Sequence, residues 1–197
     1  MPQLTLHYTP GASSMATHIA LREVGAPFEL KLIELYQQEN RKPEYLAVNP
    51  DGKVPTLIVE GSEPLTEVAA TLWYLARRYP NAGLFPQYGD VEGEARVISW
   101  MSFIASTIHP ARRFGDEHWR EVFRLADIRL GKNEWVVGRY SIADIHLFRL
   151  FWRFVDTLQP ARGDYPNLMA QYYRMMARDA VKRTIAVESA VGYHLPR

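Results

Sequence analysis

Two adjacent serines, Ser13 and Ser14, follow the turn-forming stretch Thr9-Pro10-Gly11 at the start of a predicted helix. A strand that ends in Pro-Gly and passes into a serine-capped helix presents backbone N–H groups and the positive end of a helix dipole at one spot. Such a spot favours a thiolate, to which one serine hydroxyl can donate a hydrogen bond. We therefore expect a site that ionises a bound thiol, with Ser13 as the first candidate and Ser14 and Tyr8 behind it. The alternative is that both serines only cap the helix.

The thiol must come from a ligand, because the 197 residues include no cysteine. A disulfide, a thiolate metal site and a cysteine nucleophile are thereby excluded. The 23 Lys and Arg nearly balance the 22 Asp and Glu, so no basic excess is available for nucleic acid or a membrane surface. No run approaches the ~18 apolar residues that span a bilayer, and the N-terminus lacks a secretory signal. We expect a cytoplasmic protein, and no metal, since the histidines match no standard ligand spacing.

The elements that must position Ser13 alternate between strand and helix over the first 80 residues. Alternating or β-rich runs predict strands at 4–8, 28–35 and 56–60, with a short fourth strand at Leu65. Apolar residues at helical spacing, with turn residues at the ends, predict helices at 14–24, 43–48 and 67–79. Thr66 is the expected cap of the last helix. The order β-α-β-α-β-β-α indicates an α/β domain.

Helical periodicity dominates after residues 81–90, which hold Pro and Gly and are predicted as a linker. We expect one helix from 92 to 108, stopped by Pro110, and further helices at 116–130, 141–158, 167–177 and 180–190. Ser141 and Asp144 have the spacing of a capping box. The helix that they begin is apolar nearly all round, so it should be the buried spine of an all-helical domain. Its His146 is expected to be a satisfied core or surface histidine, and Arg112-Arg113 a solvated or interfacial charge pair.

Several stretches, in this order along the chain, resemble glutathione S-transferases, most of all the bacterial beta class. They are Tyr8–Ser14, His18–Glu23, Tyr45–Pro55, Leu65–Glu67, Trp100–His109 and Ser141–Asp144. The resemblance implies a thioredoxin-like α/β domain over residues 1–80 that binds glutathione, an all-helical domain over 91–197, and usually a homodimer. It further implies a detoxifying transferase that activates the thiol of glutathione for attack on a small apolar electrophile.

The resemblance also assigns roles to single residues. Beta-class enzymes carry cysteine where this chain has Ser13, so a mixed disulfide between protein and glutathione is excluded. Val54-Pro55 looks like the family's cis-proline dipeptide, whose free backbone groups pair with the cysteinyl part of glutathione. Glu67 matches the acceptor of the γ-glutamyl ammonium, and the Val68 amide can bind the neighbouring carboxylate. The simpler alternatives are a turn proline and a glutamate that favours the helix dipole.

His109 falls where beta-class proteins keep a histidine that faces the thiol, although a cation at a helix C-terminus is an equal alternative. The other predicted binding residues are Ser14, Gln38, Lys53, Ser102 and Ser106. Gln38 falls near the position at which beta-class proteins have a lysine that contacts glutathione. Between His109 and Ser141 the chain is shorter than typical beta-class proteins.

These departures favour the main alternative, a non-catalytic protein that uses the same fold for ligand binding or assembly. A glutathione-dependent isomerase of the zeta type is disfavoured, because Met15 and Thr17 occupy the region where that type has its cysteine and arginine.

Overall fold

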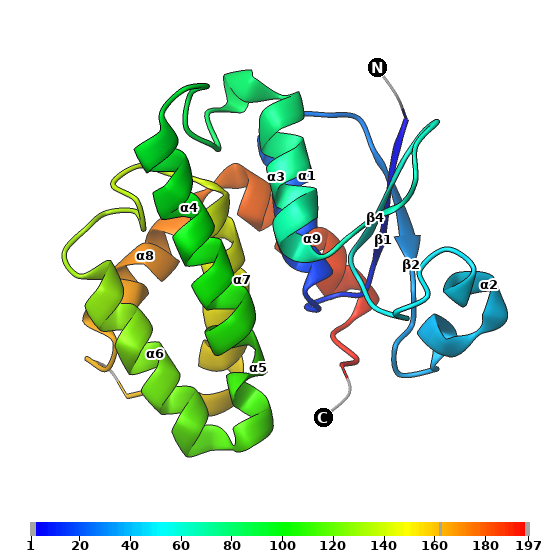
Figure 1. Cartoon of the computed structure of the whole chain (residues 1–197). Coiled ribbons are helices and arrows are strands. Elements are labelled where there is room, and N and C mark those ends of the chain that lie inside the picture. Colours follow the sequence, from blue (N-terminus) through cyan, green and yellow to red (C-terminus); the bar gives the residue numbers. More distant parts are fainter. Residues whose placement is uncertain (1–2, 162, 196–197) are drawn as a thin grey trace. The chain divides into compact units, whose positions relative to one another are not determined.

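The structure is a computed structural model that describes residues 3–161 and 163–195, so the first two residues of the N-terminus lie outside it (Figure 1). The chain divides into two compact units. We call residues 3–79 and 179–195 the sheet unit, and residues 80–178 the helical unit. The predicted helical domain, residues 91–197, differs from the helical unit at its C-terminal end. The reason is that the last helix packs against the first helix of the chain.

The sheet unit is built on a mixed four-stranded sheet with the order β2-β1-β3-β4. Its strands are β1 (Leu4–Tyr8), β2 (Glu29–Leu32), β3 (Thr56–Val59) and β4 (Leu65–Thr66). β1 is parallel to β2, with Leu6 opposite Leu30, and antiparallel to β3, with Leu6 opposite Leu57. Mixed pairing with helical connections confirms the α/β prediction. The predicted strand at 28–35 is too long, because regular pairing with β1 ends where Tyr8 meets Leu32.

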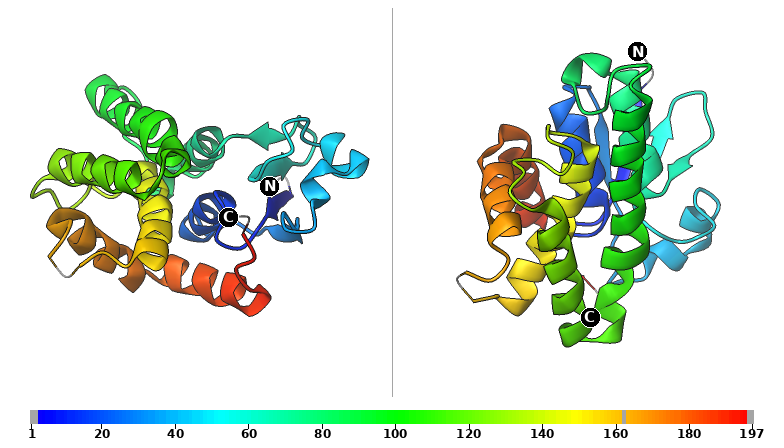
Figure 2. Two further views of the ribbon diagram at one scale, coloured as in Figure 1. Left: turned by 90° about the horizontal axis from the view of Figure 1, so that it is seen from below. Right: turned by 60° about the vertical axis from the view of Figure 1, so that its left-hand side comes forward.

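Four α-helices accompany this sheet among the described residues: α1 (Ser14–Glu23), α2 (Pro43–Leu46), α3 (Val68–Arg78) and α9 (Asp179–Val191). A 3-10 turn, η1 (Glu39–Arg41), precedes α2. α1 packs against β1, α3 and α9, and Figure 2 shows α9 beside α1 although the sequence separates them widely. Leu4 and Leu6 of β1 are buried on one face, while His7 contacts Tyr45 of α2 on the other. Thr66 does not cap α3 as predicted, because it pairs with Thr56 in the sheet.

The helical unit begins with the 3-10 turn η2 (Pro80–Ala82) and is organised around α7 (Ile142–Leu158). Its other main helices are α4 (Val91–Phe103), α6 (Asp116–Leu130) and α8 (Pro166–Ala177). α7 contacts both α4 and α8, and Phe154 lies 4.5 Å from Phe123 of α6 between ring centroids. The capping box is confirmed, since Ser141 and Asp144 bond each other's backbone. The buried spine is confirmed as well.

The helix predicted to stop at Pro110 does not stop there. α4 passes into a π-helical segment, η3 (Ile104–Ile108), then α5 (His109–Ala111) and the 3-10 turn η4 (Arg112–Phe114). Proline lacks a donor and clashes with the carbonyl one turn back in a regular α-helix. A wider π turn shifts the hydrogen-bond register just before the proline, and Pro110 then begins a new turn. His109 is therefore followed by helical backbone and does not end the helix.

Candidate active site

The loop between β1 and α1 carries the serine pair. Gly11 adopts a positive φ of 69°, which turns the chain so that the Ala12 amide donates to Thr9 O at 3.0 Å. Ser13 follows as the N-cap residue of α1, yet its backbone is helical (φ −56°, ψ −25°) and its side chain makes no capping hydrogen bond. Ser13 is half-buried. Its hydroxyl is therefore not used by the helix in the way that the capping alternative requires.

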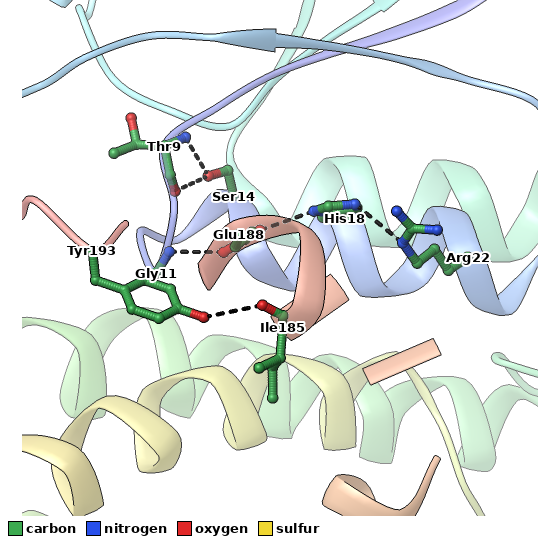
Figure 3. A network of polar contacts seen from close by, with 8 residues as sticks. All are labelled: Thr9, Gly11, Ser14, His18, Arg22, Ile185, Glu188 and Tyr193. Atoms are coloured by element: carbon green, nitrogen blue, oxygen red, sulfur yellow. Dashed lines mark hydrogen bonds and ion pairs between the residues drawn. The ribbon is translucent and has the colours of Figure 1, made fainter. Parts of the chain in front are cut away.

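Ser14 behaves differently. Its side chain is fully buried, and its hydroxyl both accepts from the Thr9 amide and donates to the Thr9 carbonyl, each at 3.1 Å (Figure 3). These two bonds close the loop onto the end of β1. The geometry therefore gives Ser14 a structural task, whereas the Ser13 side chain makes no capping hydrogen bond.

A buried polar network between α9 and α1 also binds this loop. Figure 3 shows Glu188 of α9 between Gly11 and His18: Oε2 accepts from the Gly11 amide at 2.7 Å, and Oε1 lies 2.9 Å from His18 Nδ1. Arg22 Nε donates to His18 Nε2 at 3.2 Å. Because Nε2 accepts, Nδ1 must carry the hydrogen that Glu188 accepts, which makes the contact a hydrogen bond of one tautomer. His18 and Glu188 are both fully buried.

The network has two consequences for the site. Gly11 gives its amide to Glu188, and the amides of Met15 and Ala16 donate to the carbonyls of Ala12 and Ser13, so these three amides near the start of α1 are already used within the protein. Sequence reasoning missed Glu188 altogether. Its only local signal is a glutamate at an inward position of a C-terminal helix, and nothing local links it to a loop at residue 11.

Tyr8, at the end of β1, is buried and lies edge-on to the His18 ring at 5.8 Å. Burial, and then the charge of Glu188, raise the pKa of its phenol above the ordinary value. The phenol therefore stays protonated at neutral pH and is able to donate a hydrogen bond to a thiolate. This is compatible with a supporting role near the thiol, as the sequence predicted.

A second part of the site lies before β3. The Val54–Pro55 peptide bond is cis, as the resemblance implied. Val54 is buried in a small cluster with Ala12, Ile33 and Tyr45. The carbonyl of Lys53 accepts hydrogen bonds from Asn49 Nδ2 at 2.9 Å and from the Tyr45 hydroxyl. The Lys53 side chain is exposed. The backbone around the cis bond is thus fixed beside Ala12 of the serine loop.

Glu67 is the most unusual backbone position in this region. It is the N-cap of α3 with φ 64° and ψ 131°, a conformation that residues other than glycine seldom adopt. Its carboxylate is exposed and makes no capping bond. The buried Val68 follows as the first residue of α3, where backbone amides lack partners within the helix. Strained conformations of this kind concentrate at ligand sites. A carboxylate and helix-end amides therefore stand together, as the resemblance implied.

The remaining predicted residues are not brought into this group by any described contact. Gln38 is exposed, with a left-handed backbone (φ 56°), and precedes η1. Ser102, Ser106 and His109 belong to the helical unit. Both serines are exposed, and Ser106 Oγ donates to Ser102 O at 2.8 Å. His109 is exposed and donates its amide to Ile104 O across the π turn.

Two wider searches of the described residues add to this picture. No group of three or more His, Asp or Glu side chains in the described ranges is placed to hold a metal ion. None of the helices found there combines the length and the apolar character that a membrane span requires.

The sheet unit and the helical unit are a thioredoxin-like α/β fold and an all-helical fold, the pairing found in glutathione transferases. Residues 12–78 match the description "Glutathione S-transferase, N-terminal domain", and residues 114–179 match "Glutathione S-transferase, C-terminal domain". The chain therefore belongs to the glutathione S-transferase family.

Individual relatives agree with this assignment. Glutathione S-transferase GST-4.5 of Xanthomonas campestris is 31% identical and is matched over 94% of this chain and 98% of its own length. The bacterial beta-class enzyme of Sphingomonas chungbukensis is 33% identical with a TM-score of 0.83, over 94% of this chain and 98% of that one. A sphingomonad glutathione S-transferase solved in complex with glutathione is 32% identical with a TM-score of 0.84, over 93% and 98%.

Proposed function

We propose that the protein is a glutathione transferase in which Ser13 stabilises the thiolate of bound glutathione. The observation that carries this proposal is the contrast within the serine pair. The Ser14 hydroxyl is buried and committed to Thr9, whereas the half-buried Ser13 makes no capping bond. Membership of the family, and a similar structure solved in complex with glutathione, support the choice of ligand.

Glutathione would lie along the backbone at Val54, with its γ-glutamyl end at Glu67 and the Val68 amide. Its sulfur would accept a hydrogen bond from Ser13 beside the N-terminal end of α1. A free cysteinyl thiol has a pKa near ~8.5, and each unit of lowering corresponds to ~1.36 kcal/mol of anion stabilisation. The thiolate electron pair then forms a carbon–sulfur bond with the electrophile, and the leaving group departs with the electron pair of the broken bond. Tyr8 and His109 are the alternative donors.

Three further parts of the proposal rest on properties that are typical of the family. The electrophile is small and largely apolar, the protein is a homodimer, and it works in the cytoplasm. The domains that would carry these tasks are residues 1–80 for glutathione and 91–197 for the second substrate, joined by residues 81–90.

The test compares the two serines. The pKa of bound glutathione is read from thiolate absorbance in wild type, Ser13→Ala and Ser14→Ala, together with kcat/KM toward an apolar electrophile. We expect a lowered thiol pKa in wild type, and a loss of ~10- to 100-fold in kcat/KM for Ser13→Ala as one donor to the developing anion is removed. In Ser14→Ala the thiol pKa should stay near that of wild type.

An unshifted thiol in wild type, or an unchanged rate in Ser13→Ala, would remove the serine from this role. Tyr8→Phe and His109→Gln then identify the donor. Retention on immobilised glutathione without turnover of any electrophile would select the non-catalytic ligand-binding alternative.

A further inference from the structure

Two buried threonines join α1 to α3 within the sheet unit, where these helices pack against each other (Figure 1). Thr17 Oγ1 of α1 lies 2.8 Å from Thr71 Oγ1 of α3, and both residues are fully buried. A hydroxyl that is removed from water is costly unless it is hydrogen-bonded, and these two hydroxyls bond each other. We call this hydrogen bond the threonine link.

The direction of the threonine link follows from a second contact of Thr71. Its hydroxyl donates to the Val68 carbonyl at 3.0 Å. Because threonine has a single hydroxyl hydrogen, Thr71 Oγ1 must accept the hydrogen that Thr17 donates. The Thr71 amide also donates to the Glu67 carbonyl at 3.0 Å. Thr71 therefore binds the carbonyls of both Glu67, with its positive φ of 64°, and Val68.

The threonine link lies equally far into the two helices. Thr17 comes four residues after Ser13, the N-cap of α1, and Thr71 comes four residues after Glu67, the N-cap of α3. Four residues are about one helical turn, and residues at this spacing lie on the same face of a helix. One turn of helix thus separates the threonine link from each N-cap. The link therefore restrains Ser13 and Glu67 relative to each other.

We propose that Thr17 and Thr71 are positioning residues that set the distance between the two ends of the glutathione site. This inference rests on the proposed function, in which Ser13 meets the sulfur and Glu67 with Val68 meets the γ-glutamyl group. A ligand that is bound at two points gains affinity from both only when the spacing of the protein groups matches its own. The threonine link thereby allows the sulfur to add to the affinity that the γ-glutamyl group supplies.

The experiment compares glutathione with an analogue in which a methyl group replaces the thiol, by calorimetric titration of the full-length protein. The ratio of the two dissociation constants reports the contribution of the sulfur. We expect wild type to prefer glutathione by ~10-fold or more, as is usual for a hydrogen bond to a charged group. Thr17→Val keeps the shape of the side chain but removes the donor, so this preference should fall by ~3-fold or more. Affinity for the analogue should change by less than ~2-fold, because Thr71 still binds the Glu67 and Val68 carbonyls.

Four further variants separate the hydrogen bond from packing. Thr17→Ser keeps the donor and should retain the preference of wild type, whereas Thr17→Ala removes the donor and should lose the preference as Thr17→Val does. Thr184→Val makes the same chemical change at a fully buried threonine of α9, whose hydroxyl has no hydrogen-bond partner among the described residues. It should leave the preference unchanged. Thr71→Val also releases the Val68 carbonyl, so it should weaken the binding of both ligands.

The possible results distinguish this inference from the function on which it rests. Equal affinity of wild type for glutathione and the analogue would remove the sulfur contact and overturn both. A preference in wild type that Thr17→Val and Thr17→Ala retain would overturn the positioning role alone. An equal loss of preference in Thr17→Ser or Thr184→Val would assign the effect to packing, and would also overturn that role. Thermal unfolding without ligand confirms that each variant is folded.

Discussion

Two of the buried histidines, His18 in the sheet unit and His146 in the helical unit, have different polar environments. His18 in the sheet unit uses both ring nitrogens, since Nδ1 binds Glu188 and Nε2 accepts from Arg22. His146 in the helical unit is also buried, but its Nδ1 has no partner, and burial, followed by the charges of His109 and Arg149, lowers its pKa. The first environment is complete without a ligand, and the second is not. His7 of the sheet unit resembles His146, because its buried Nδ1 also has no hydrogen-bond partner, so the contrast separates individual side chains and not the two units.

The comparison also separates stability from function. Removing one member of a satisfied network lowers the protein's free energy of unfolding, because the former partners stay buried without a hydrogen bond. An unsatisfied group behaves in the opposite way, since its removal takes away a desolvation cost. The two regions should therefore respond to substitution with opposite signs.

The largest effect is expected for Glu188→Ala. This change leaves the Gly11 amide and His18 Nδ1 buried without an acceptor, which should cost ~3 kcal/mol or more of the free energy of unfolding. Glutathione affinity should also fall, because Gly11 precedes the serine pair. Urea denaturation measures the free energy of unfolding, and calorimetric titration measures the glutathione affinity. Ser189→Ala, at the exposed neighbouring position, is the control. A loss below ~1 kcal/mol would show that the network is not what holds the loop.

His18 variants sharpen the tautomer assignment. His18→Ala should cost ~2 kcal/mol, the desolvation penalty of leaving a buried carboxylate oxygen and the Arg22 donor unpaired. Asparagine places an N–H near the position of Nδ1, so His18→Asn should recover part of this loss in urea denaturation. Glutamine mimics Nε2 instead and should recover less. The reverse order would mean that Nε2, not Nδ1, carries the hydrogen.

His146 gives stability a dependence on pH. Its folded pKa of about 3 lies below the ordinary 6.5, so the unfolded chain binds a proton that the folded chain refuses. The stabilisation is present above pH ~6.5 and is lost as the pH falls toward 3, by ~2 kcal/mol at pH 5. His146→Leu should flatten this decline in urea denaturation, measured at pH 7.5 and 5. His118→Gln, at an exposed histidine, should leave the decline as it is, and an equal decline in His146→Leu would place its origin elsewhere.

Much of the fold follows from local pattern. Period-2 and period-3.6 apolar spacing located the strands and main helices within a few residues, and Ser141 with Asp144 marked the start of α7 correctly. The error at Pro110 arose because a π turn is a response of the backbone to the proline, and no residue type specifies it. Thr66 was misassigned because its pairing with Thr56 in the sheet outweighs its preference for a cap.

The candidate site can be proposed from the sequence only where a short motif marks it. Ser13, the Val54-Pro55 dipeptide and Glu67 each stand in a recognisable local context. Glu188 was missed because its partner Gly11 is 177 residues away, and a contact of that range leaves no periodicity in the sequence.

The smallest effect tests the comparison within the serine pair itself. Ser14→Ala removes both hydrogen bonds to Thr9 and leaves a buried amide unpaired, so the free energy of unfolding should fall by ~1 to 2 kcal/mol. Ser13→Ala removes no capping bond and should change it by less than ~0.5 kcal/mol. Urea denaturation of the two variants without glutathione measures the difference. If Ser13→Ala were the more destabilising, its hydroxyl would be part of the loop's own structure, and the thiol would need another donor.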